Sequence, residues 1–169
     1  ECSHYLKYYN NFFSNYQKTA NKIMEIGVKD GQSLKIWRDY FGLDTKIVGL
    51  EINSEPLENF TLPNTEIYFG DQTDFKFLHR LIEKENKFDI IIDDGGHTQE
   101  QLISSFEYLF KYGLRDGGMY VMEDLGCSYW HRWSGGLNNR SIVISFLKDK
   151  IESLNFRFWK GNRSDYIPK

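Results

Sequence analysis

One segment constrains the fold of this chain more than any other: the run of three isoleucines at 90–92, which lies between Phe88 and Asp94. A short run of β-branched residues bounded by turn signals predicts a strand. The run lacks the alternation of polar and apolar residues expected of a strand with one face in water. Both of its faces must therefore be covered, as in the parallel sheets of α/β proteins.

The rest of the chain alternates between helical and strand patterns. Thr98 and Gln101 form a capping-box pattern that opens a helix, and Gly113 closes it. Strands that alternate with helices predict right-handed crossovers within one parallel sheet. We therefore expect an open, doubly wound, Rossmann-like α/β fold. The helices are expected at 3–18, 33–41, 74–85, 98–113 and 141–154, and the strands at 22–25, 46–51, 66–71, 88–94 and 118–124, with a candidate sixth strand at 156–159.

The length and composition indicate one folded domain. The 169 residues are about one domain's worth, which we expect to span 1–169. With 40% hydrophobic and 27% charged residues, the composition is that of an ordinary globular protein and argues against disorder. The chain begins with Glu1 rather than Met, so we expect it to be excised from, or truncated relative to, a longer chain.

Charge, hydropathy and cysteine usage exclude several classes of partner. The 21 basic and 24 acidic residues form no basic stripe, so we expect no nucleic-acid partner. The longest uncharged apolar stretch, 141–147, is too short to span a membrane, and the first residues given lack the charged and apolar regions of a signal peptide. Cys2 and Cys127 make no disulfide framework, and neither has a metal-ligand partner at short spacing. We therefore expect a cytoplasmic protein.

The predicted strands all end in acidic residues. Open α/β sheets bind their ligands at the carboxyl ends of the strands, where these residues would share one edge. A single acid at a turn is common, but acids at all five strand ends predict a functional rim. The acids at these ends are Glu25, Glu51, Asp71, Asp93, Asp94, Glu123 and Asp124.

A glycine-containing loop follows the first strand. Gly27 and Gly31 would let the backbone turn tightly and approach a ligand closely. Glu51, twenty residues after Gly31, is placed to accept hydrogen bonds from both hydroxyls of a ribose. Lys29 stands where a dinucleotide-binding loop has its middle glycine, which argues against NAD or FAD. A simple strand-to-helix turn is the alternative reading of the two glycines.

Five segments carry a family resemblance: 25–34 (EIGVKDGQSL), 70–74 (GDQTD), 91–97 (IIDDGGH), 121–125 (VMEDL) and 128–130 (SYW). Together they resemble class I S-adenosylmethionine-dependent methyltransferases. More narrowly, they are similar to the metal-dependent sugar O-methyltransferases of macrolide and related natural-product pathways, and cephalosporin-hydroxylase-like proteins share part of the pattern. The combination of the fourth-strand and fifth-strand motifs is more specific than the glycine loop.

The resemblance, which runs from about residue 4 to residue 130, implies S-adenosylmethionine as the cofactor. In the family the first loop cradles the methionine part, the acid after the second strand holds the ribose, and the acid after the third strand lies beside the adenine. The residues that this resemblance marks as cofactor-binding are Glu25, Gly27, Gly31, Ser33, Glu51, Asp71, Gln72 and Asp93.

The resemblance also implies a divalent metal site and a general base. Mg²⁺, or another divalent cation, would be held by Asp94, Glu123 and Asp124, and His97 would be the catalytic base. Elementary chemistry agrees, because a sugar hydroxyl is a poor nucleophile near neutral pH. A metal lowers the pKa of a bound hydroxyl, and a histidine side chain, with an ordinary pKa of about 6.5, can take the proton.

Plainer interpretations of these residues stay open. Asp93 and Asp94 could cap the helix that begins near Thr98, and His97 could be an ordinary loop histidine. Adjacent strand residues point to opposite faces, so Asp93 and Asp94 are not expected to share a role. The aromatic segment 129–133 could form a wall for a sugar ring or pack over the sheet.

The leading functional hypothesis is a Mg²⁺-assisted O-methyltransferase that acts on a hydroxyl of a sugar or of a glycosylated small molecule. The alternative is a non-catalytic S-adenosylmethionine-binding or scaffold module of a larger polysaccharide or natural-product biosynthesis protein. A sugar dehydrogenase and a methyltransferase for catechol-type acceptors rank lower. Class I methyltransferases usually close their sheet with an antiparallel strand pair, and only one candidate strand follows Leu154. The closing strands are thus expected to be incomplete, and a homo-oligomer is left open.

Overall fold

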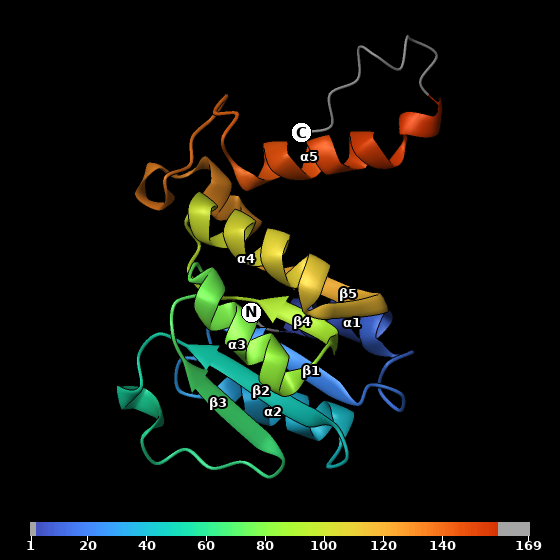
Figure 1. Cartoon of the computed structure of the whole chain (residues 1–169), viewed down its shortest axis with the longest axis vertical. Coiled ribbons are helices and arrows are strands. Elements are labelled where there is room, and N and C mark those ends of the chain that lie inside the picture. Colours follow the sequence, from blue (N-terminus) through green and yellow to red (C-terminus); the bar gives the residue numbers. More distant parts are fainter. Residues whose placement is uncertain (1–2, 159–169) are drawn as a thin grey trace.

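Five parallel strands form the centre of the structure, a computed structural model that describes residues 3–158 (Figure 1). Their order across the sheet is β3-β2-β1-β4-β5, so the chain reverses its direction of winding between β1 and β4. Ligands of open α/β sheets bind at such a switch point. The predicted doubly wound α/β fold is confirmed. The strands are β1 (Lys22–Ile26), β2 (Lys46–Glu51), β3 (Thr65–Phe69), β4 (Phe88–Asp93) and β5 (Leu114–Met122).

Helices cover both faces of the sheet. On one face, α1 (Ser3–Phe13) and α2 (Gln32–Phe41) pack their aromatic residues against the strands. On the other face lie α3 (Phe75–Glu85) and α4 (Gln99–Tyr112), which contribute a second set of buried leucines. Helix α5 (Val143–Leu154) packs on α4, one layer further from the sheet (Figure 1).

The isoleucine run of β4 shows why the fold needs two helical layers. Ile90 and Ile92 are fully buried in the core cluster on the α1–α2 side, whereas Ile91 is fully buried in the cluster on the α3–α4 side. Side chains of a strand point alternately to its two faces, so an uninterrupted apolar strand is stable only between two layers. The expectation from the sequence is confirmed.

The helix boundaries follow local capping chemistry. The Asp74 side chain accepts hydrogen bonds from Lys76 N and Phe77 N at the start of α3. Thr98 and Gln101 form the predicted reciprocal capping box of α4. The first helix, predicted at 3–18, is shorter in the structure. Helix α1 ends at Phe13, because the backbone then tightens into turns in which Phe13 O accepts from Tyr16 N at 2.8 Å.

The candidate sixth strand was wrong. Residues 156–158 form a short 3₁₀ helix, in which Phe158 N donates to Asn155 O at 2.9 Å, and Trp159 lies outside the described residues. This segment follows α5, which packs on α4 rather than along the edge of β5, so no strand partner is at hand. Within residues 3–158 all strand pairs are parallel, and no antiparallel strand pairs with β5. The other 3₁₀ helices are η1 (Glu55–Leu57), η2 (Leu125–Tyr129) and η3 (His131–Trp133).

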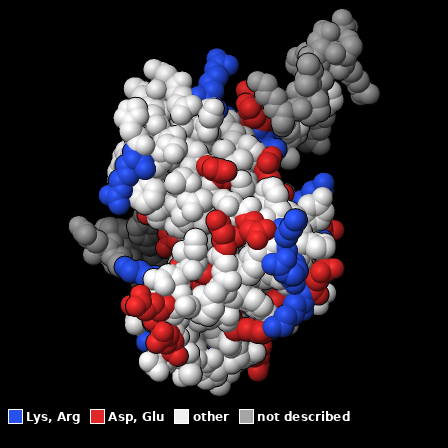
Figure 2. Space-filling view, turned by 60° about the vertical axis from the view of Figure 1, so that its left-hand side comes forward, with Lys and Arg blue, Asp and Glu red and all other residues white. Residues whose placement is uncertain are grey.

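Two surface properties bear on partners. No helix in the described part of the chain has the length and apolar character needed to cross a bilayer. The face shown in Figure 2 carries acidic and basic side chains interspersed, with acidic ones in its middle.

Candidate active site

A cleft of about 580 Å³ lies at the carboxyl ends of the strands. The loop between β1 and α2, the ends of β2 and β3, and the loop at 94–97 form its walls. Most of the residues predicted from sequence line it, namely Gly27, Ser33, Glu51, Asp71, Gln72, Asp94, His97 and Asp124. Glu25, Gly31, Asp93 and Glu123 do not.

The floor of the cleft depends on Gly27. Its φ is +83°, and a Cβ there would overlap the carbonyl oxygen of Asp94. Gly27 N donates to Leu50 O at 2.8 Å, and Asp94 N donates to Ile26 O at 3.0 Å, so the ends of β1, β2 and β4 are tied together. Only glycine fits this left-handed, closely packed position. The loop after β1 is therefore a tight turn at the switch point, fixed by these backbone hydrogen bonds and possible only with glycine at position 27.

Glu51 holds the other side of the same loop. Its Oε2 accepts from Lys29 N at 2.7 Å, and its Oε1 accepts from Ile52 N at 2.8 Å and Asn53 N at 3.1 Å. A carboxylate oxygen has about two acceptor directions, so Oε2, which accepts only from Lys29 N, can still receive a bond from a ligand in the cleft. Gly31, at φ +78°, does not line the cleft; a Cβ there would overlap the ring of Phe60.

Asp71 and Gln72 follow β3 but differ in their surroundings. Asp71 is exposed at the mouth of the cleft, and its Oδ1 accepts from both Thr73 N and Thr73 Oγ1. Gln72 is buried, and its Oε1 accepts from Gly96 N at 2.7 Å. Its Nε2 donates to Asp93 Oδ1 at 3.2 Å. Asp71 is therefore accessible to a ligand, whereas the amide of Gln72 is already committed to the protein.

Asp93 points away from the cleft. It is fully buried, and its Oδ2 accepts hydrogen bonds from Ser105 Oγ and from Tyr120 OH. Burial raises the pKa of this carboxyl. Because neighbouring strand residues face opposite sides, Asp93 turns toward α4 while Asp94 turns toward the cleft. The expectation that Asp93 contacts the cofactor is therefore corrected: its side chain is enclosed by the protein.

Glu25 lies just behind the cleft wall. It is buried at the end of β1, and its Oε2 accepts from Ser33 Oγ at 2.7 Å. Burial raises the pKa of Glu25 to about 7, and the hydrogen bond from Ser33 opposes this. Ser33 lines the cleft, so Glu25 fixes the direction of a hydroxyl that a ligand can reach.

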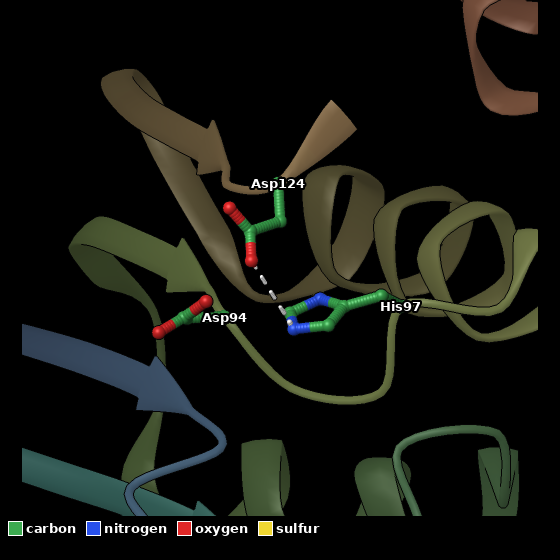
Figure 3. A group of neighbouring side chains, drawn as sticks. All are labelled: Asp94, His97 and Asp124. Atoms are coloured by element: carbon green, nitrogen blue, oxygen red, sulfur yellow. Dashed lines mark ion pairs between the residues drawn. The ribbon is translucent and has the colours of Figure 1, made fainter. Parts of the chain in front are cut away.

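Three side chains converge at the ends of β4 and β5. Asp94, His97 and Asp124 each offer one ligand atom, and these atoms lie within 4.8 Å of one another. Figure 3 shows them around a common point, with His97 Nε2 at 3.6 Å from Asp124 Oδ2. Asp124 has φ +50°, a left-handed conformation that sets the direction of its side chain. Such a group of oxygen and nitrogen atoms can hold a cation.

The electrostatics of Asp94 favour a cation. Burial, and next the charges of Glu123 and Asp124, together raise the pKa of Asp94 to about 7. Among residues 3–158, no lysine or arginine forms an ion pair with Asp94 or Asp124. A positive charge at this point would therefore relieve the repulsion between carboxylates.

Glu123 does not join this group in the structure. Its Oε1 accepts a hydrogen bond from the hydroxyl of Tyr9, which comes from α1 on the other side of β5. Glu123 is nevertheless close enough for its charge to raise the pKa of Asp94. Helical periodicity places Tyr9 on the apolar face of the first helix but does not show which strand end its hydroxyl will reach.

His97 has a defined orientation. Its Nδ1 is buried without a hydrogen-bond partner in the structure, whereas Nε2 faces Asp124. The ring meets Trp133 edge to face, with centroids 5.4 Å apart. The aromatic segment therefore has a mixed role: Trp133 packs against His97, whereas Tyr129 and Trp130 are exposed.

Comparison with known proteins places this geometry in a class. No protein-family model matches the chain. Among solved structures, the MycE methyltransferase from the mycinamycin biosynthetic pathway, in complex with Mg and SAH, superposes with a TM-score of 0.82 at 29% identity. The match covers 96% of this chain and 43% of that one. The chain therefore has the fold of class I methyltransferases.

The similar sequences narrow the class. Mycinamicin VI 2''-O-methyltransferase of Micromonospora griseorubida is 32% identical over 87% of this chain, and demethylmacrocin O-methyltransferase of Streptomyces fradiae is 34% identical over 87%. The chain spans about two fifths of the length of these relatives. It is thus homologous to the sugar O-methyltransferases of macrolide and related pathways, as its motifs indicated.

Proposed function

We propose that this chain is the catalytic domain of a S-adenosylmethionine-dependent, Mg²⁺-assisted O-methyltransferase for a hydroxyl of a sugar or of a glycosylated small molecule. The convergence of Asp94, His97 and Asp124 beside a cleft at the switch point carries the proposal. The similarity to a methyltransferase structure that holds Mg and SAH supports it. We take 1–169 as one domain of a longer protein; its cytoplasmic location and oligomeric state stay predictions.

The cleft fits S-adenosylmethionine. Its volume of about 580 Å³ is in the range of ligand pockets, and the close packing at Gly27 lets a ligand approach the backbone. Glu51 is placed for the ribose hydroxyls, Asp71 for the adenine side, and Ser33 for the methionine part. The cofactor would supply an electrophilic methyl group for an in-line displacement by the acceptor oxygen.

The acid group fits a hard divalent cation. Asp94 and Asp124 would supply carboxylate oxygens, which Mg²⁺ prefers to imidazole nitrogen. A bound cation would lower the pKa of the acceptor hydroxyl and orient it. For Glu123 to become a third ligand, it would have to release its hydrogen bond from Tyr9.

His97 then serves as the general base. Its Nε2 faces the space beside Asp124, where an acceptor hydroxyl would lie, and the ring is supported by Trp133. A proton leaving the hydroxyl would pass to Nε2 as the oxygen attacks the methyl group. The edge-to-face contact keeps the ring direction without occupying the reactive nitrogen.

A second hollow supports a glycosylated acceptor. A groove of about 370 Å³ runs between α1 and the end of β5, lined mainly by apolar side chains such as Tyr8, Phe12 and Leu125. Asp124 lines both this groove and the cleft. An acceptor whose hydroxyl lies at Asp124 can therefore rest an apolar body in the groove, which a free sugar would leave empty.

Methyl transfer from labelled S-adenosylmethionine tests the proposal. A panel of free sugars and glycosides should give a methylated glycoside with Mg²⁺ and none in chelator. His79→Ala, which removes an exposed histidine of α3, is the matched control for His97→Ala. Transfer that is equal in chelator would refute the metal role. Tight cofactor binding without transfer to any glycoside would favour the scaffold alternative, and reduction of NAD by a sugar would favour the dehydrogenase.

A further inference from the structure

A buried glutamine connects the core to the loop that carries two of the proposed site residues. Gln72 is 6% exposed, and its Oε1 accepts from Gly96 N at 2.7 Å. Gly96 lies between Asp94 and His97. The glutamine therefore bonds the backbone of the same loop that presents both side chains to Asp124.

The other end of the amide is anchored as well. Nε2 donates to Asp93 Oδ1 and to Ser105 Oγ, both at 3.2 Å, and approaches Gln101 O at 3.5 Å. The orientation of the amide follows from these partners, because the reverse orientation would place Oε1 against the Asp93 carboxylate and Nε2 against a backbone N–H. Asp93 is itself held by Ser105 and Tyr120.

The loop has little of its own to hold it. Gly95 and Gly96 lack side chains, and glycine pairs have wide conformational freedom in an unconstrained loop. In the structure both are enclosed by glutamines: a Cβ on Gly95 would overlap Gln72 Oε1, and a Cβ on Gly96 would overlap the amide of Gln101. The conformation of the loop is thus set from outside.

We propose that Gln72 is a positioning residue. Through the chain of bonds Asp93–Gln72–Gly96, it holds the loop in the one arrangement that brings Asp94 and His97 to Asp124. The consequence for methyl transfer rests on the proposed function, but the positioning itself does not. The sequence marked Gln72 only as a cofactor-binding residue, and in the structure both ends of its amide are bonded within the protein.

The test compares Gln72→Leu with wild type in the absence of cofactor. Removing the hydrogen bond from Gly96 N to Gln72 Oε1 should speed hydrogen exchange of the Gly96 amide on the order of tenfold or more, because the loop then opens locally. The imidazole NMR signals of His97 should shift, and the affinity for Mn²⁺ alone, followed by its EPR signal, should fall about tenfold, in the range seen when supports of metal ligands are lost. Gln72→Asn, whose side chain is shorter by one methylene, should show the same changes if the leucine variant does not fold.

Gln99→Leu is the matched control. Gln99 is another buried glutamine whose amide is bonded at both ends: Nε2 donates to Trp133 O, and Oε1 accepts from Val143 N. It makes no hydrogen bond with the Gly96 backbone. Its loss should leave Gly96 exchange within about twofold of wild type. If Gln72→Leu leaves Gly96 exchange and Mn²⁺ affinity unchanged and lowers only S-adenosylmethionine affinity, Gln72 is a direct cofactor contact and the positioning role is refuted. A wild-type protein without methyl transfer would count against the proposed function alone.

Discussion

The two ends of the parallel sheet both hold partly buried carboxylates, but their surroundings are opposite. At the amino end, Glu85 is 1% exposed and pairs with Lys22 and Lys46, whereas Glu66 pairs with Lys46 and Lys84. The lysine hydrogen bonds lower the pKa of Glu66 to about 2. Burial opposes the same effect at Glu85, but its hydrogen bonds still hold its pKa below the ordinary value. Each of these two acids thus pairs with two lysines, one of which, Lys46, they share.

At the carboxyl end the acids have no such partners. Burial and mutual repulsion raise the pKa of Asp94 to about 7, and burial raises that of Glu123. In the part of the chain that the structure describes, the only ion pair of this group is between His97 and Asp124. Balanced acids at one end stabilise the fold, whereas unbalanced acids at the other end carry an electrostatic cost. The difference is best explained if a ligand supplies the missing positive charge.

The largest effect should follow the loss of the proposed base. His97→Ala should lower kcat by on the order of 10²–10⁴, the usual contribution of a positioned general base. The affinity for S-adenosylmethionine should stay within a factor of about three, because the imidazole would act on the acceptor. Kinetics and calorimetry measure the two effects separately. Equal losses in both would show that His97 is structural.

Loss of a balanced acid should cost stability. Glu85→Gln removes the charge that accepts from Lys22, Lys46 and Tyr68, and should lower the free energy of unfolding by about 1.5–3 kcal/mol. Urea unfolding measures this change. Glu58→Gln, at an exposed position, is the control and should change the free energy by less than about 0.5 kcal/mol. If Glu85→Gln left the stability unchanged, the lysine-paired acids would not stabilise the fold, and the contrast with the unpaired acids at the carboxyl end would be lost.

Glu25, a buried acid at the carboxyl end, should make the free energy of unfolding depend on pH. Its pKa of about 7 in the folded protein lies above the ordinary value of 4.5, so the folded state binds more protons between these pH values. Stability from this group is therefore complete below about pH 4.5 and is lost as the pH rises through 7. Glu25→Gln should remove this decline, so between pH 5 and pH 8 the variant should gain about 2–3 kcal/mol of stability relative to wild type. Urea unfolding at the two pH values tests it; parallel slopes in both proteins would contradict the assignment.

Loss of an unbalanced acid should have the opposite sign to Glu85→Gln. In metal-free buffer at pH 8, Asp94→Asn should raise the free energy of unfolding by up to about 1 kcal/mol, because it removes a repelled carboxylate. Mg²⁺ should then stabilise the wild type but not the variant. Asp44→Asn, an exposed acid far from the cleft, should respond to Mg²⁺ as wild type does. A destabilised Asp94→Asn protein without Mg²⁺ would mean that the acid is structurally satisfied.

Much of the fold could be predicted because hydrophobic periodicity reports which faces are buried. The isoleucine run required two helical layers, and Thr98 with Gln101 marked a helix start by a local hydrogen-bond pattern. The placement of acids at the carboxyl rim also followed from strand direction alone. Asp94, His97 and Asp124 meet there because parallel strands end at one edge.

The directions of individual side chains could not be predicted in this way. Asp124 has a left-handed backbone conformation that its sequence does not reveal, and Tyr9 reaches Glu123 across more than a hundred residues. Gln72 and its neighbour Asp71 both line the cleft, but the amide of Gln72 is bonded within the protein whereas Asp71 is exposed. Patterns in sequence specify faces and ends of elements, whereas these contacts depend on tertiary packing between distant elements.

The most direct test of the central claim is a calorimetric titration of Mg²⁺ into the cofactor-free chain, repeated with Asp124→Asn. The account predicts saturable binding at one site in wild type and an affinity at least about tenfold weaker in the variant, because one of the two carboxylates that face the cation is lost. Absence of binding in wild type, or equal binding in both proteins, would contradict the claim that the unbalanced acids of the carboxyl end form a cation site.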